Sequence, residues 1–115
     1  GQKAGIGFLL GDIGRIVVAL TGEIDMENAP QVRRALLDNL KQKRDVLVDL
    51  SQVTYIDSSG IASLIEGLQA ARKQKNDLAL VSVSQRARRV LELARLDKVF
   101  TIHPDLATAL AAVKS

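Results

Sequence analysis

The sequence predicts one α/β domain, residues 1–115, with a mixed sheet of about five strands and about four helices. Apolar runs of strand length alternate with segments whose apolar residues have helical spacing. Two such runs stand together at the start, which favours an opening hairpin. The chain has 115 residues and no Cys, a size that fits one domain with one core and no disulfides.

The opening hairpin is predicted from two apolar runs, Ile6–Leu10 and Arg15–Leu20. The segment between them, Gly11–Gly14, contains two glycines and an aspartate, which are typical of turns. After the second strand, we expect Thr21–Asp25 to leave the sheet as a polar loop.

The first helix is predicted to follow that loop. Asn28 is a residue type that caps helices, and Pro30 is tolerated in a first turn. Val32, Leu36 and Leu40 recur at helical spacing and should face the core.

The next strand and helix flank the stretch on which the functional argument depends. Asp45–Leu50 is an apolar run with β-branched residues, and Ile61–Leu68 has apolar residues at helical spacing. Asp57 lies between them and is a good acceptor for the free N–H groups at a helix start. Gly60 would allow close packing there, and Ser58 would fall in the first helical turn.

After this helix, strands and helices continue to alternate along the chain. This order implies parallel strands joined by helical crossovers. Leu78–Val83 is predicted as a strand, and Ser84 is predicted to cap a helix. Residues 98–102 are expected to form a short edge strand. The final helix should follow Pro104 and bury one stripe. Its predicted members are Leu106, Ala109, Leu110 and Val113.

Ser58 is a candidate phosphoacceptor. A phosphate there would meet the positive end of the helix, and it would add about −1.5 to −2 charges to the surface. Such a modification would leave the fold intact and break a complex. The alternative is that the Asp-Ser-Ser-Gly sequence is only a cap and a tight turn.

Four segments together carry a family resemblance: Thr21–Asp25, Val48–Ser51, Ile56–Gly60 and the helix expected from Ser84. They resemble the STAS family, and within it the single-domain bacterial anti-sigma-factor antagonists. The resemblance implies a STAS-like fold and a partner-switching protein without catalytic residues or a cofactor. The unmodified antagonist binds an anti-sigma factor that is also a serine kinase, and this binding releases a sigma factor.

The resemblance also implies roles for individual residues. Ser58 is the residue that the kinase would phosphorylate, using ATP bound to the kinase. A phosphatase would remove the phosphate again. Asp25 matches a loop acid near the partner surface, and Asp57, Ser59 and Gly60 complete the expected partner-binding site. Ser59 and Ser63 lie close enough to be labelled as well, although local hydrogen bonding is the usual role of such serines.

A second branch of the family offers an alternative. Small STAS subunits sit on the cytoplasmic side of ABC-type phospholipid transporters, where the partners are a permease and an ATPase. The arginines at positions 86, 88, 89 and 95 depart from a simple picture of the antagonists. We expect their charged ends to face solvent.

Composition disfavours several other classes of protein. The net charge is +3 and aromatic residues make up 3%, so direct nucleic-acid binding is not expected. We see neither an apolar run that could span a bilayer nor a signal peptide, so we expect a cytoplasmic protein. One His and no Cys argue against the usual zinc and iron sites.

A hydrolase and a nucleotide-binding protein are two further alternatives, and both would need a small-molecule site. A hydrolase would pair Ser58 or Ser59 with His103 and Asp105, but the Gly-x-Ser-x-Gly motif is missing. A nucleotide site would use the glycine-bearing turn, but neither common glycine-rich phosphate-binding motif is present. Both are weaker predictions than a binding protein.

Overall fold

The computed structural model describes residues 5–12 and 15–111, and it confirms the predicted mixed sheet with four helices. The five strands lie in the order of the chain, from β1 to β5. β1 and β2 are antiparallel, and all later neighbours are parallel. The strands are β1 (Gly5–Asp12), β2 (Arg15–Ile24), β3 (Asp45–Ile56), β4 (Leu78–Val81) and β5 (Ile102–His103).

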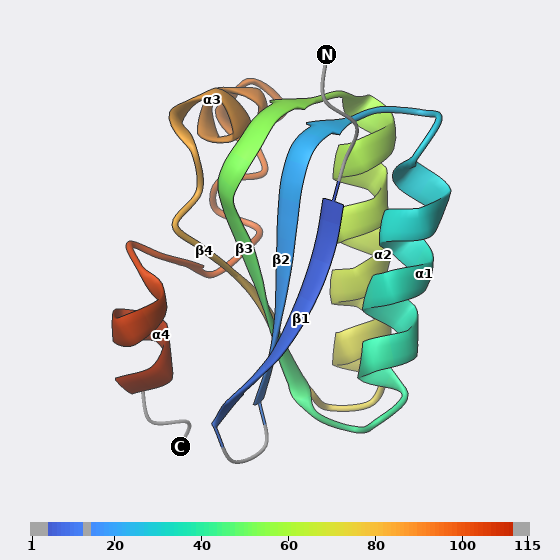
Figure 1. Cartoon of the computed structure of the whole chain (residues 1–115), viewed down its shortest axis with the longest axis vertical. Helices are drawn as coiled ribbons and strands as arrows, with labels where there is room; N and C mark the ends of the chain where they lie inside the picture. The colour runs from blue at the N-terminus through green and yellow to red at the C-terminus, as the bar shows by residue number, and fades with distance from the viewer. Residues whose placement is uncertain (1–4, 13–14, 112–115) are drawn as a thin grey trace.

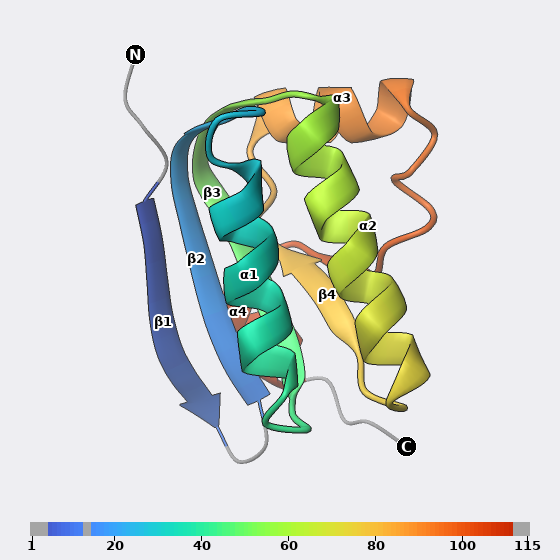
Figure 2. The same ribbon diagram turned by 90° about the vertical axis from the view of Figure 1, so that its right-hand side faces the viewer.

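The helices cover the sheet unequally (Figures 1 and 2). They are α1 (Ala29–Leu40), α2 (Ser58–Lys73), α3 (Gln85–Leu93) and α4 (Leu106–Ala111). α1 and α2 lie side by side on one face, α4 lies on the other, and α3 crosses the end of the sheet where β3 finishes. None of the described helices combines the length and the apolar character that crossing a membrane requires.

The main core lies between the sheet and the α1–α2 layer. Alternate strand residues such as Val18 and Val48 point into it, where they meet the predicted stripe of Val32, Leu36 and Leu40. A smaller cluster lies under α4. Its buried members are Val17, Leu47, Ala79, Val81 and Ala109.

Two strands are longer than predicted. Thr21–Asp25 was expected to leave the sheet, but β2 continues through Ile24, which pairs with Ile56 of β3. β3 likewise runs to Ile56 instead of ending at Leu50. The β2–β3 register shifts at two places, and such irregularities interrupt the alternation from which a strand is recognised. Both strands therefore extend well beyond β4, and they end together.

The remaining differences are at element ends. Ile13 and Gly14 of the predicted turn lie outside the described residues, while Gly11 and Asp12 still belong to β1. β4 ends at Val81, because Ser82 takes a left-handed backbone conformation with φ 51°.

The last strand and helix also differ in detail. β5 is Ile102–His103, so it shares only Ile102 with the predicted segment 98–102. In the last helical stripe, Ala109 is buried as predicted, and Val113 lies outside the described residues.

Candidate functional site

The turn from β3 to α2 is built by the side chain of Asp57. Its Oδ1 atom accepts hydrogen bonds from the backbone N–H groups of Ser59, at 2.9 Å, and Gly60, at 3.1 Å. These groups lack partners within a helix, so the carboxylate caps α2 as the sequence predicted. Ser58 is the first residue of α2, and its side chain is exposed.

Gly60 lets this turn pack tightly onto the ends of β2 and β3. A Cβ atom at this position would lie 2.6 Å from Ile56 Cγ1 and 2.8 Å from Ile24 Cγ2. Glycine is therefore needed for close approach. The tight contact fixes the start of α2, and with it Ser58, against the rigid end of the sheet.

The turn from β2 to α1 lies next to the β3–α2 turn, because the two strands end as a pair. The backbone N–H of Asp57 donates to Ile24 O at 3.1 Å and links the two turns directly. Asp25 comes next in the chain, and its Oδ1 accepts from the N–H of Glu27 at 3.0 Å. The structure thus brings Asp25 and the Asp57–Gly60 segment together, as the predicted partner site requires.

Asn28 precedes α1 as predicted, but its side chain does not cap that helix. Its Oδ1 accepts from the N–H of Asp25 and its Nδ2 donates to Glu23 O, at 3.0 and 2.8 Å. The prediction of a side-chain cap was wrong because two backbone groups, at the end of β2 and in the turn after it, hold the amide instead. The bonds brace the turn that presents Asp25.

The three nearby serines differ in accessibility. Ser58 is exposed, Ser59 is half-buried, and Ser63 is buried with a 4% exposed fraction. Ser63 Oγ lies 3.1 Å from both Ala29 O and Ser59 O, so it joins α1 to α2. Of the three serines, Ser58 is the most exposed.

Two exposed apolar side chains lie near Asp25 and Ser58 in the chain, and no sequence pattern predicted them as part of the site. Met26 is 73% exposed in the turn after β2, and Tyr55 is 50% exposed near the end of β3. Large exposed apolar groups beside a polar turn are typical of protein-binding surfaces. In the sequence, Met26 directly follows Asp25, and Tyr55 stands two residues before Asp57.

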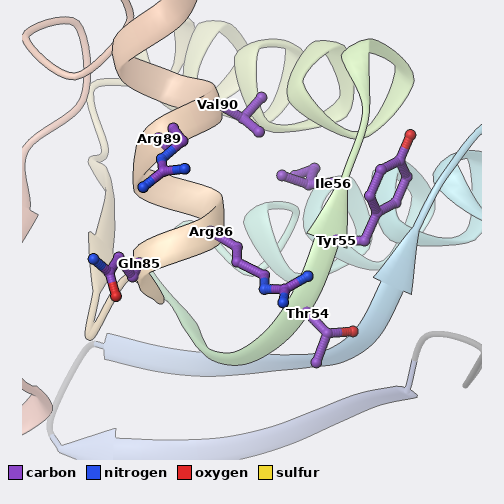
Figure 3. A pocket seen from close by; sticks show the side chains of 7 residues that line it. All are labelled: Thr54, Tyr55, Ile56, Gln85, Arg86, Arg89 and Val90. Atoms are coloured by element: carbon purple, nitrogen blue, oxygen red, sulfur yellow. The ribbon is translucent and has the colours of Figure 1, made fainter.

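A pocket of about 460 Å³ lies beside this turn, between β3 and α3 (Figure 3). Arg86 and Arg89 line it and are exposed, in agreement with the predicted solvent-facing arginines. Arg88 is half-buried and does not line the pocket, and Arg95 lies beyond α3. The arginines therefore do not form one continuous group.

The hydrolase combination is not assembled. His103 pairs with Val81, which pairs with Asp49 of β3, and β3 then runs on to Ile56. Those seven residues correspond to about 23 Å of strand, so His103 and Ser58 are far apart. Asp105 instead bonds to Thr108 at the start of α4, and the backbone N–H of Thr108 lowers the pKa of the Asp105 carboxyl.

Replacing Asp57 with alanine should lower the free energy of unfolding by about 0.5–2 kcal/mol, since two N–H groups lose their acceptor. Asp57→Asn should remain close to wild type, because asparagine caps equally well. Urea unfolding of the three proteins measures the difference. Equal losses for both variants would contradict the capping role, because they would implicate the charge.

Comparisons with known proteins agree with this architecture. The sequence model of the STAS domain matches residues 10–109. The anti-sigma-B factor antagonist of Listeria monocytogenes is 30% identical over 92 residues, which cover 79% of this chain and 81% of that protein. The Bacillus subtilis protein of the same name is 31% identical over 87 residues, or 76% and 80% of the two chains.

A solved structure extends the likeness to nearly the whole chain. The crystal structure of an anti-sigma factor antagonist from Mycobacterium paratuberculosis has a TM-score of 0.86 and 29% identity to this chain. The match covers 98% of this chain and 96% of that one. Since the domain match spans most of the sequence and the folds agree throughout, this chain belongs to the STAS domain family.

Proposed function

We propose that this protein is a cytoplasmic anti-sigma-factor antagonist whose binding is switched by phosphorylation of Ser58. The unmodified protein binds an anti-sigma factor and so releases a sigma factor. The anti-sigma factor is also a serine kinase, which uses ATP to modify Ser58 and end the complex, and a phosphatase restores the hydroxyl. The protein acts by binding and catalyses no reaction of its own.

One observation carries this proposal: Ser58 is exposed at the start of a helix that the side chain of Asp57 already caps. Within the described residues its hydroxyl makes no hydrogen bond, and Asp57 occupies the N–H groups of Ser59 and Gly60. A phosphate on Ser58 would therefore break no internal contact. The names of the sequence relatives supply the class of partner.

The surroundings of Ser58 explain how a phosphate would act on a complex. Because Asp57 already caps the helix, the phosphate would point outward, beside the carboxylates of Asp57 and Asp25. From the sequence, a phosphate on Ser58 is expected to meet free N–H groups at the helix start. Two of those groups, on Ser59 and Gly60, instead donate to Asp57. The added charge of about −1.5 to −2 would face the partner and repel acidic or apolar groups packed there.

Mapping the phosphate tests the proposal. The anti-sigma factor that a pull-down with the wild-type chain recovers is incubated with that chain and ATP. We expect one phosphate on the peptide containing Ser58, none on Ser58→Ala, and normal labelling of Ser59→Ala. Labelling on Ser59, or no labelling of a protein that binds the kinase, would refute the assignment.

A pull-down from cell extract with the wild-type chain as bait separates the two branches of the family. Recovery of a kinase-like anti-sigma factor with the bait supports the proposal. Recovery of a transporter permease and its ATPase would instead support the phospholipid-transporter alternative. The relatives named above favour the sigma-factor branch.

A further inference from the structure

The pocket beside the Ser58 turn is formed by two elements that are distant in the sequence. β3 contributes Thr54, Tyr55 and Ile56, and α3 contributes Gln85, Arg86, Arg89 and Val90. Its volume of about 460 Å³ falls within the range of about 300–1,000 Å³ that is usual for ligand sites.

The position of α3 over the strand is held by Ser84. Its Oγ lies 2.8 Å from Val53 O and accepts from the N–H of Ala87 at 3.2 Å. This serine therefore caps α3 and joins it to β3. Hydrogen bonds therefore hold the start of α3 against β3, the two elements that form the pocket.

The pocket is cationic, and its charge is not compensated. Arg86 and Arg89 stand one helical turn apart on the same face of α3, and Arg86 extends toward β3 (Figure 3). Among the described residues, ion pairs join Arg33 to Glu66 and Lys41 to Asp38. Neither pocket arginine has an acidic partner or a hydrogen-bonded carbonyl among the residues that the structure describes.

We propose that this pocket receives acidic side chains of the partner protein and is a second docking point beside Ser58. This inference rests on the proposed function, since the partner is the same anti-sigma factor. Guanidinium groups form strong, geometrically specific pairs with carboxylates. Tyr55 also lines the pocket, and its half-exposed ring points away from the two arginines (Figure 3). Exposed tyrosines of this kind are frequent in protein interfaces.

Continuity with the switch favours a protein as the occupant. Tyr55 and Ile56 line the pocket and lead directly into Asp57 and Ser58, so a protein that covers Ser58 also covers the pocket mouth. The surface then has acids on one side, Asp25 and Asp57, and cations on the other. Such a pattern fixes the orientation of a partner and excludes partners with the wrong charges.

The test compares the double variant Arg86→Gln/Arg89→Gln with wild type and with Arg88→Gln. Arg88 is on the same helix but does not line the pocket, so its variant shows the effect of removing one positive charge from α3 outside the pocket. The probe is the anti-sigma factor recovered by the wild-type bait, and its Kd is measured at low and at high salt. We expect the double variant to bind about tenfold more weakly at low salt, with a smaller difference at high salt. The control should stay within about twofold.

The outcomes distinguish this inference from the proposed function. If wild type binds and loses binding on phosphorylation while the double variant binds equally well, the second docking point is wrong and the switch stands. If wild type binds no anti-sigma factor, the proposed function is wrong, and this inference, which rests on it, is wrong as well. The double substitution could also weaken binding of inorganic phosphate or of phosphatidylglycerol vesicles but not of the anti-sigma factor. That result would overturn the inference of a protein docking point.

Discussion

Replacing Gly60 with valine is expected to lower the free energy of unfolding by about 3 kcal/mol, the upper part of the usual range for overpacking. The new Cβ would fall 2.6 Å and 2.8 Å from two isoleucine carbons. Those atoms, Ile56 Cγ1 and Ile24 Cγ2, belong to β-branched side chains on paired strands, so they have little freedom to move. Valine adds two further methyl groups to the same crowded space.

The measurement is thermal and urea unfolding of Gly60→Val beside Ala62→Val. Ala62 is exposed on the same helix, so its variant shows the cost of a β-branched residue alone, about 0.5 kcal/mol. For a domain of this size, we expect Gly60→Val to melt roughly 10–15 °C below wild type. Equal stabilities of the two variants would contradict the close packing described at this turn.

Ser58→Asp is expected to weaken binding of the anti-sigma factor by at least about 30-fold, equivalent to about 2 kcal/mol. The new carboxylate would lie at the partner surface beside Asp57 and Asp25, where it would lose water on binding without gaining an opposite charge. Its effect on stability should stay within about 0.5 kcal/mol, because Ser58 is exposed and an acid near a helix start is tolerated.

The control for that prediction is Gln69→Glu, measured by the same titration. Gln69 is exposed on α2, about 16 Å along the helix from Ser58, and the change also makes the protein more acidic by one charge. We expect its affinity to match wild type. If Ser58→Asp also matches wild type while remaining folded, Ser58 is not at the interface.

Local chemistry explains why the α2 cap could be predicted and the α1 cap could not. Asp57 acts on N–H groups two and three residues later, a relation that the sequence contains. Asn28 has the same capping preference, but Glu23 O and the N–H of Asp25 hold its amide. Those partners depend on where β2 ends, which is a property of the strand pairing rather than of local preference.

The lengths of β2 and β3 were underestimated for a related reason. Past Leu50, two exposed residues follow one another, so the period of two is lost. The strand persists because β2 supplies hydrogen-bonding partners across register shifts. A pattern within one strand carries no information on its neighbour, so the sequence predicts a loop at Thr21–Asp25, where β2 still pairs with β3 through Ile24.

The cationic pocket could not be predicted, since its two walls are about thirty residues apart in the sequence. The sequence did indicate that Arg86 and Arg89 would be exposed, and they are. Which of the arginines line the pocket depends on how α3 lies against β3, and the bond from Ser84 to Val53 joins these two elements.

Release of a sigma factor from its complex tests the central claim most directly. The chain, unmodified or fully phosphorylated on Ser58, is added to the preformed complex of the anti-sigma factor with its sigma factor, and free sigma factor is measured. We expect the unmodified chain to free the sigma factor in proportion to the amount added, and the phosphorylated chain to free almost none at the same concentrations. Equal release by the two forms, both folded, would contradict a switch at Ser58.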